Sequence, residues 1–241
     1  MSNSVILNNA IHKDLKVITK TGEAYGSNVM HAMTFPAEFR DVQSCYPIFF
    51  CKDPATGQFY PTALFGFEKD QNLFLNGDSW EASYIPMMIK RHPFLIGFQA
   101  DPEKGEGAKK PIISIDMDNP RISQTEGEAL FTDSGEPSEY LKQSMARLEA
   151  IHRGHEHNKI FIETLLKNEL LQSFTLEITL NNGSNNQLSG FYTIDEEKLH
   201  KLGAEALASL HSQGFLQAIY MTVASFARIR PMIDKQNAIL A

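Results

Sequence analysis

The sequence is poor in cysteine. Only two of its 241 residues are cysteines, Cys45 and Cys51. On a single strand these two residues would lie about 20 Å apart, which is too far for a disulfide, and their spacing matches no zinc pattern. We therefore expect two buried free thiols and a reducing compartment.

The sequence also lacks an excess of basic residues and any long apolar run. Its formal net charge is −7, whereas general binding to a phosphate backbone needs a basic face, so we expect no nucleic-acid partner. No apolar stretch approaches the length of a membrane span. The first residues show neither the cationic start nor the apolar run of a signal peptide. The expectation is a soluble, cytoplasmic protein without a membrane span, and export by a route that needs no signal stays an alternative.

The chain does contain enough apolar residues for a sizeable core, at 42%. In its first half, short apolar runs alternate with turns that are too short for crossover helices, which predicts antiparallel strands. A short helix is expected around residues 84–92, ending before Pro93. The expected strands cover residues 15–19, 29–33, 47–52, 59–67, 73–75, 94–99 and 112–115.

The second half has the pattern of long helices around a hairpin. Apolar residues recur at helical spacing from Pro137 to Leu166, with a break or kink possible at Gly154. Strands over 174–180 and 187–194 flank a loop of turn formers, which predicts a hairpin. Helices are expected at 195–212 and 215–230, with Pro231 ending or kinking the last one.

The predicted fold class is therefore α+β, with a mostly antiparallel, strand-rich N-terminal half and long helices with a β-hairpin in the C-terminal half. We expect residues 1–241 to form one domain. An alternative has two lobes, 1–118 and 137–241, joined by the polar loop 119–137.

Two groups of residues suggest metal chemistry. His152, His155 and His157 lie in one helical stretch, and histidines with a carboxylate suit zinc or ferrous iron. Their spacing departs from the zincin pattern, however, and a solvated polar patch in mid-helix explains them as well. Asp116 and Asp118 would share one face at a strand end and could hold a divalent cation, but carboxylates at strand ends also form ordinary turns. We favour neither as a metal site and expect no cofactor.

The remaining constellation is aromatic and basic. Trp80, the only tryptophan, stands near Tyr84 and Arg91, and together they could line a pocket for a peptide or a planar anion. In the alternative interpretation, the two aromatic rings fill the core and Arg91 pairs with a carboxylate. We select Trp80, Tyr84 and Arg91 as candidate ligand-binding residues.

Short segments in a fixed order along the chain form a recognisable series. They are Phe35-Pro-Ala-Glu-Phe39, Tyr46-Pro-Ile-Phe-Phe50, Ala63-Leu-Phe-Gly66, Asn72-Leu-Phe74, Trp80, Tyr84-Ile-Pro86, Lys90-Arg-His-Pro-Phe94, Ile115-Asp116, Leu130-Phe131, Gly135-Glu-Pro137, Gly190-Phe-Tyr-Thr-Ile-Asp-Glu196 and Gly214-Phe-Leu-Gln-Ala-Ile-Tyr220. No single segment is diagnostic, but the ordered series is specific. Through it, the chain as a whole resembles the SapC family of bacterial proteins, across about residues 28–230. Where the family tends to show Arg-Arg-Tyr before Pro-Phe, this chain has Lys90-Arg91-His92, which argues against a catalytic role for His92.

The resemblance implies a link to a bacterial surface-layer locus, and it supplies no catalytic residues. The unrelated transporter permease of the same name is excluded, because this chain has no apolar span. We expect a non-enzymatic peptide- or protein-binding or accessory protein in an envelope, surface-layer or peptide-modification pathway. One alternative is a metal-dependent enzyme that uses the cluster His152–His157 or the pair Asp116 and Asp118. Another is a structural subunit of a surface layer.

Overall fold

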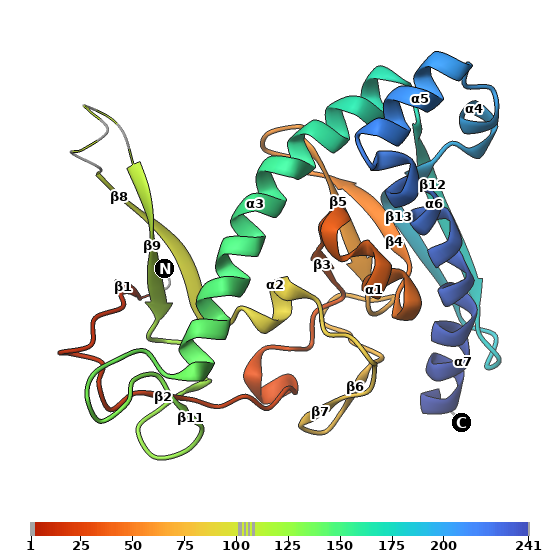
Figure 1. Ribbon diagram of the computed structural model, residues 1–241. Coiled ribbons are helices and arrows are strands. Elements are labelled where there is room, and N and C mark those ends of the chain that lie inside the picture. The colour runs from red at the N-terminus through yellow and green to blue at the C-terminus, as the bar shows by residue number, and fades with distance from the viewer. Residues whose placement is uncertain (1–2, 101–102, 104, 106, 108, 241) are drawn as a thin grey trace. The chain divides into compact units, whose positions relative to one another are not determined.

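The computed structural model describes residues 3–100, 103, 105, 107 and 109–240. It confirms the α+β class, with antiparallel sheets and long C-terminal helices (Figure 1). The chain forms two compact units whose segments alternate along the sequence, and residues 119–137 all lie within the first. The expectation of a single domain stays a prediction. The first unit comprises Met1–Ser27, Gly77–Ser79 and Met87–Arg153, and the second Asn28–Asn76, Trp80–Pro86 and Gly154–Ala241.

The first unit holds two small antiparallel sheets. In one, the central strand β9 pairs with β1 and with β8, and in the other β2 pairs with β10 and β11. The expected helix at 84–92 is only one turn long, α2 (Met87–Lys90). The strands are β1 (Ser4–Ile6), β2 (Lys16–Val17), β8 (Phe94–Ala100), β9 (Lys109–Asp116), β10 (Ile122–Ser123) and β11 (Glu128–Ala129), and a 3-10 turn, η1, covers Glu23–Tyr25.

The core of the first unit forms where these sheets meet the helix α3 (Glu139–Lys167), which contributes its residues up to Arg153 to this unit. Phe94 and Ile115 face each other across β8 and β9, because directly paired residues point to the same side of a sheet. Both are fully buried and pack with the rest of the cluster. Its other members are Leu15, Val17, Leu130, Phe131, Leu141 and Leu148.

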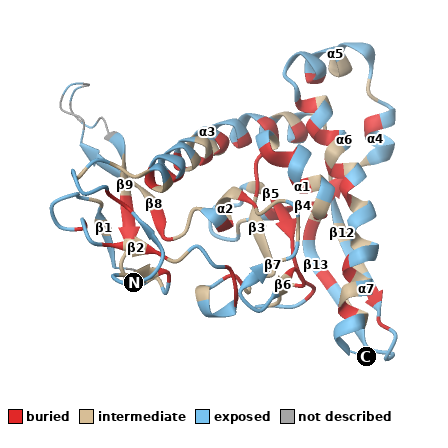
Figure 2. Cartoon of the chain, turned by 60° about the horizontal axis from the view of Figure 1, so that its bottom comes forward, coloured by how far each residue is buried: buried red, intermediate tan, exposed pale blue. Residues whose placement is uncertain are grey.

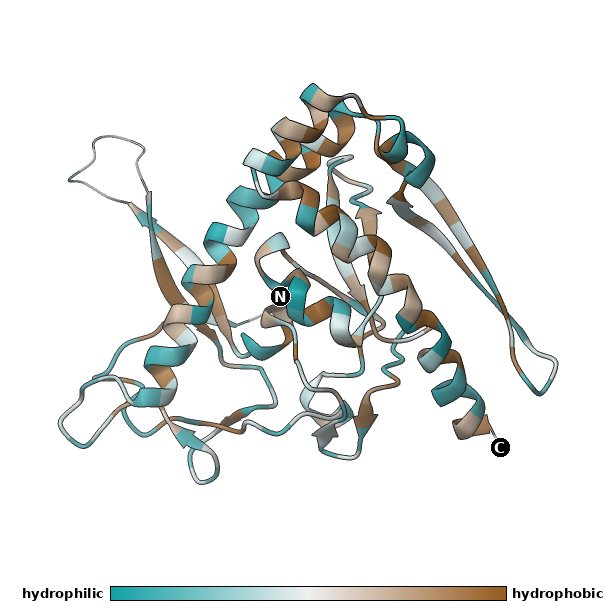
Figure 3. Ribbon diagram, turned by 45° about the vertical axis from the view of Figure 1, so that its right-hand side comes forward, coloured by the Kyte–Doolittle hydropathy of each residue, from teal (hydrophilic) through white to brown (hydrophobic). Residues whose placement is uncertain are grey.

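The second unit is built on a five-stranded antiparallel sheet in the order β12-β13-β4-β5-β3. The expected hairpin is present, and hydrophobic and hydrophilic residues alternate along most of its first strand (Figure 3). Strand β4 is almost wholly buried (Figure 2). The strands are β3 (His31–Met33), β4 (Ile48–Lys52), β5 (Phe59–Leu64), β12 (Leu171–Thr179) and β13 (Asn185–Ile194), and a separate small ribbon pairs β6 (Leu75–Asn76) with β7 (Ser79–Trp80).

Helices complete the second unit, and α6 packs against α1, β4 and β13. The expected helix at 195–212 is two helices, and the one expected at 215–230 ends at Ser225. Pro231 does not end a helix, because it lies in the first turn of a further helix that runs to Leu240, and proline is tolerated there. The helices are α1 (Phe39–Cys45), α4 (Glu196–His200), α5 (Ala204–Ser212), α6 (Phe215–Ser225) and α7 (Ile229–Leu240), with 3-10 turns η2 (Pro36–Glu38) and η4 (Phe226–Arg228). Among the described residues, no helix is long and apolar enough to cross a membrane.

Helix α3 is continuous through Gly154, where the sequence allowed a break. In the second unit, the ring of the fully buried Phe35 lies directly on the backbone of Gly154. A Cβ atom at this position would meet two ring carbons of Phe35 at 2.7 Å. The glycine is therefore explained by a close approach of a side chain, and not by a bend of the helix.

Candidate functional site

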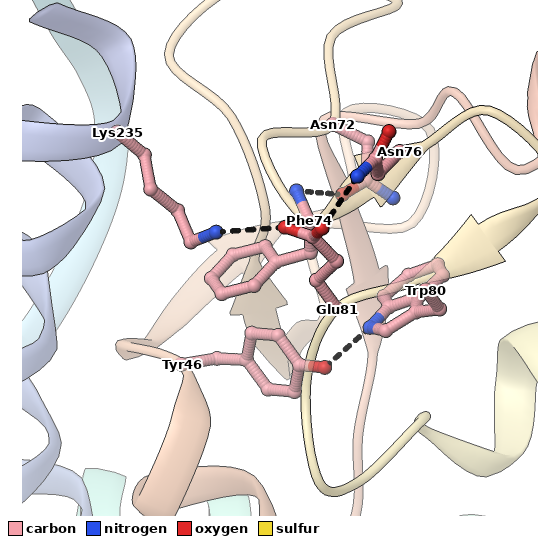
Figure 4. A network of polar contacts seen from close by, with 7 residues as sticks. All are labelled: Tyr46, Asn72, Phe74, Asn76, Trp80, Glu81 and Lys235. Carbon is pink, nitrogen blue, oxygen red and sulfur yellow. Dashed lines mark hydrogen bonds and ion pairs between the residues drawn. The ribbon is translucent and has the colours of Figure 1, made fainter. Parts of the chain in front are cut away.

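A chain of hydrogen bonds in the second unit links two of the predicted ligand residues, Trp80 and Tyr84. The indole Nε1 of Trp80 donates to the hydroxyl of Tyr46 at 2.6 Å (Figure 4). The Tyr46 hydroxyl in turn donates to the backbone carbonyl of Tyr84. The Tyr84 hydroxyl donates to Oε2 of Glu38 at 2.7 Å. The structure thus brings Trp80 and Tyr84 together through a residue that sequence reasoning did not select.

Tyr46 is the centre of this arrangement. It follows α1 in an extended conformation, and its backbone N–H closes the helix on the carbonyl of Val42 at 2.8 Å. Its ring is fully buried and meets the rings of Phe65 and Phe74 edge-on, with centroids 5.1 and 4.7 Å away. Burial raises the pKa of the Tyr46 phenol, although the Trp80 hydrogen bond acts against this. The phenol therefore stays protonated and remains a donor.

Glu38 is the second residue that the sequence analysis missed. Its side chain is only 3% exposed, and its Oε1 accepts a hydrogen bond from the hydroxyl of Thr34 at 2.9 Å. Buried carboxylates are stable only with such donors. Glu38 is the last residue of a 3-10 turn, η2 (Pro36–Glu38). The only signal of its burial in the sequence is its place in the short segment between Phe35 and Phe39.

The network continues from Thr34 to helix α3. The side-chain amide of Asn158 donates from Nδ2 to the backbone carbonyl of Thr34 at 3.1 Å, and Asn158 is 6% exposed. Its Oδ1 is buried and has no hydrogen-bond partner in the described part of the chain. A buried acceptor without a donor is uncommon and needs an explanation. The unpaired Oδ1 leaves the hydrogen-bond network incomplete at Asn158.

Charged side chains flank the aromatic end of the network. Lys235 on α7 places its Nζ 3.5 Å from Oε2 of Glu81 and 5.6 Å from the ring centroid of Phe74. The side chain of Asn76 donates to the other carboxylate oxygen of Glu81 at 2.7 Å, and this bond and then Lys235 lower the pKa of Glu81. Trp80 itself is half-buried. An aromatic ring that is partly exposed between fixed charges suits contact with a peptide.

Cys45 lies beside this network at the end of α1. Its Sγ is 3.1 Å from the hydroxyl of Ser83 and 3.4 Å from that of Ser44. Burial alone would raise the pKa of the Cys45 thiol, but these hydroxyls and the backbone N–H groups of Ser83 and Tyr84 outweigh it, so the pKa is lowered. Cys51 is buried, which raises its pKa to about 11. Both thiols are free, but Cys45 is only half-buried, so the expectation of two buried thiols is wrong for Cys45.

Arg91 belongs to the first unit and is half-buried there. Its Nη1 donates to the backbone carbonyl of Phe94 at 3.3 Å, and its Nε has no hydrogen-bond partner within the described residues. Burial lowers the pKa of Arg91. The neighbouring His92 has a pKa lowered to about 4, first by burial and then by the charges of Arg91 and Arg121, which outweigh Asp116.

The histidines of the proposed metal cluster each pack against a phenylalanine. In the first unit, His152 meets Phe98 edge-on at 6.1 Å between centroids. In the second unit, the partners are Phe35 for His155 and Phe215 for His157, both at 5.1 Å.

The backbone of Asp118 contacts the side chain of Asp116, as in a turn. The N–H of Asp118 donates to Oδ1 of Asp116 at 3.3 Å, and the N–H of Asn3 donates to Oδ2 of Asp118 at 3.3 Å. Across the described ranges, no group of three or more His, Cys, Asp or Glu side chains is arranged to hold a metal ion. The metal hypothesis therefore gains no support from the positions of these residues.

Comparison with known proteins identifies the family. The SapC family model matches residues 7–232, so the chain belongs to the SapC family, as its segments predicted. No curated protein and no solved structure matches the chain.

Proposed function

We propose that this SapC-family protein is a non-enzymatic binding or accessory protein that takes a peptide or protein partner in a bacterial envelope, surface-layer or peptide-modification pathway. Trp80 and Tyr84 are the proposed contact residues. The observation that carries the proposal is that both side chains are half-buried while their polar atoms are used inside the protein. Both residues thus keep part of their surface exposed, where a partner could make contact.

Rigidity favours such a surface. The indole of Trp80 is held by Tyr46 and lies edge-on to Phe65 at 5.2 Å between centroids. The ring of Tyr84 is held by its hydroxyl on the buried Glu38. Fixed aromatic side chains lose little conformational entropy on binding, and tryptophan and tyrosine are the residues that most often dominate interfaces. Arg91, in the first unit, stays a separate proposed ligand residue because guanidinium groups suit anionic partners.

The only tryptophan makes the proposal directly testable. Peptides are selected from a random dodecapeptide phage library on the immobilised full-length chain, and the enriched peptides are synthesised. Titration of the protein with each peptide is then followed by Trp80 fluorescence and by calorimetry. We expect saturable fluorescence changes with the same dissociation constant in both measurements.

Variants separate this surface from others. Tyr84→Ala removes the ring and is expected to weaken binding at least about tenfold, as hot-spot truncations do. Tyr220→Ala is the matched control, because Tyr220 on α6 is 52% exposed and lies outside the network. Circular dichroism checks that both variants fold. Equal affinities of the wild type and Tyr84→Ala would refute the proposed surface.

The two alternatives have their own tests. Elemental analysis of untagged protein by mass spectrometry would reveal a stoichiometric transition metal if the cluster His152–His157 serves an enzyme. For Asp116 and Asp118, which suit calcium or magnesium, calorimetric titration of the protein with each ion is the corresponding test. A surface-layer subunit would assemble into ordered arrays, which sedimentation velocity detects. Either a bound metal or such arrays would count against the binding role.

A further inference from the structure

Strand β12 forms one edge of the five-stranded sheet in the second unit, and within the described chain it pairs only with β13 (Figure 1). It is nine residues long, whereas strands of about five or six residues are the commonest. An edge strand presents a row of backbone N–H and C=O groups that another strand can pair with. No backbone group of the described residues outside β13 pairs with β12.

The edge of β12 lacks the features that usually keep such strands from pairing, which are lysine, proline, bulges and short length. Its sequence contains no Lys, Arg or Pro, and Glu177 is its only charged residue. Glu177 is also the only charged residue of the whole hairpin, residues 171–194, in a chain whose net charge is −7. Between two paired positions β12 advances from Phe174 to Leu176 while β13 advances by three residues, so the bulge lies on β13. The edge itself is regular and open to pairing.

One face of β12 carries apolar side chains that continue the core as far as the edge. Phe174, Leu176 and Ile178 occupy alternate positions and therefore project from the same face. Ile178 is buried, and the Phe174 ring stacks on Phe49 and Phe226 with centroids 5.3 and 5.8 Å away. Phe174 and Leu176 are only half-buried. A further strand with apolar residues at the same spacing would place them beside these two side chains.

A second copy of β12 supplies such a strand, and we propose that the chain forms a two-fold dimer in which β12 pairs antiparallel with β12 of a second copy. A two-fold axis perpendicular to the sheet places one residue opposite itself, and an axis at Thr175 pairs all nine residues. Phe174 then faces Leu176 of the partner subunit, and Glu177 faces Ser173 of the partner subunit, so that apolar residues meet and like charges do not. The dimer closes, because the other edge of the sheet, β3, is only three residues long.

Engineered cysteines test the register of the two strands. The Cα atoms of Thr175 and of Thr175 of the partner subunit would be about 4.5–5.5 Å apart, within the reach of a disulfide. Thr175→Cys should therefore give a covalent dimer on mild oxidation, detected on a non-reducing gel. Ser173→Cys is the matched control, because its two cysteines would lie about 13 Å apart along the strands. The wild type gives the background from Cys45 and Cys51.

Sedimentation velocity of the full-length chain measures the association itself. We expect a dimer, and no larger species, at the upper end of a concentration range of about 1–300 µM. Thr175→Lys places like charges opposite each other and should weaken the dimer about fivefold or more.

Ser189→Lys is the control for added charge, because Ser189 is an exposed residue of the inner strand β13 and should leave the dimer unchanged. Circular dichroism checks that the variants fold. A wild type that stays monomeric would overturn the proposal and leave the edge to an extended segment of another protein. Species larger than a dimer, equal disulfide formation in the two cysteine variants, or an undiminished dimer in Thr175→Lys would overturn it as well.

Discussion

Replacing Gly154 by alanine should destabilise the protein, although alanine is the better helix former. In the interior of a helix, alanine is favoured over glycine by about 1 kcal/mol. The new Cβ would, however, meet two ring carbons of Phe35 at 2.7 Å, and Phe35 is fully buried. Overpacking of this kind typically costs about 1–3 kcal/mol. A cost in the middle of this range outweighs the helix preference, so we expect a net loss of about 1 kcal/mol in the free energy of unfolding.

Urea denaturation followed by Trp80 fluorescence measures this loss in the unit that contains Gly154, Phe35 and Trp80. With a slope of about 1–3 kcal/mol per molar urea, the midpoint should fall by about 0.3–1 M. A second background provides the control: in Phe35→Leu, where the ring is gone, Gly154→Ala should become neutral or stabilising. A higher midpoint for Gly154→Ala in the wild-type background would refute the reasoning.

Three further predictions concern single side chains. At pH 8, iodoacetamide should modify Cys45 at least about tenfold faster than Cys51, because the pKa of Cys45 is lowered while that of Cys51 is about 11; peptide mass spectrometry gives the two rates, and equal rates would contradict the hydrogen-bonded thiol. Tyr84→Phe should cost about 1.5–3 kcal/mol in urea denaturation, since a buried carboxylate loses a donor at 2.7 Å; an unchanged midpoint would show that this bond contributes nothing. His92 has a folded pKa of about 4 against an ordinary 6.5, so the unfolded chain binds the proton first as the pH falls. Between pH 7 and pH 5, the free energy of unfolding should therefore drop by about 2 kcal/mol more in the wild type than in His92→Gln. Urea denaturation followed by circular dichroism at both pH values measures this, and an equal drop in both proteins would show that the shift is absent.

Local patterns in the sequence were sufficient for the elements and for the fold class. The apolar spacing around Leu141 and Leu148 predicted α3, because both side chains must reach the same core. The turn formers at 181–186 predicted the hairpin of β12 and β13, and the short connections predicted antiparallel pairing of β4 with β5. Each of these features depends on residues that are close along the chain.

The order of strands in the large sheet depends on distant residues, and no local pattern indicated it. Strand β4 lies between β5, its neighbour in sequence, and β13, with Cys51 opposite Phe191. The alternation of segments between the two units is equally non-local. Composition changes near residues 119–137 suggested a boundary between lobes, but polar turns also occur inside a unit.

Only some residues of the candidate site could be predicted from the sequence. Trp80 and Tyr84 stood out because of their residue types, whereas no motif or spacing singled out Tyr46 or Glu38. The hydrogen bond between Trp80 and Tyr46 spans 34 positions, and that between Asn158 and Thr34 spans 124. Because such bonds form only after the chain has folded, no spacing rule reveals them.

By itself, the sequence determined the family, the α+β class and most of the helices and strands, since these follow from periodicity and from segments with a fixed order along the chain. The tertiary structure decided which polar groups are buried together and which of them lack a hydrogen-bond partner among the described residues. Glu38 obtained its donors from Thr34 and Tyr84, whereas Oδ1 of Asn158 obtained none among the described residues. The physical reason is that hydrogen bonds act over about 3 Å in space, regardless of the distance along the chain.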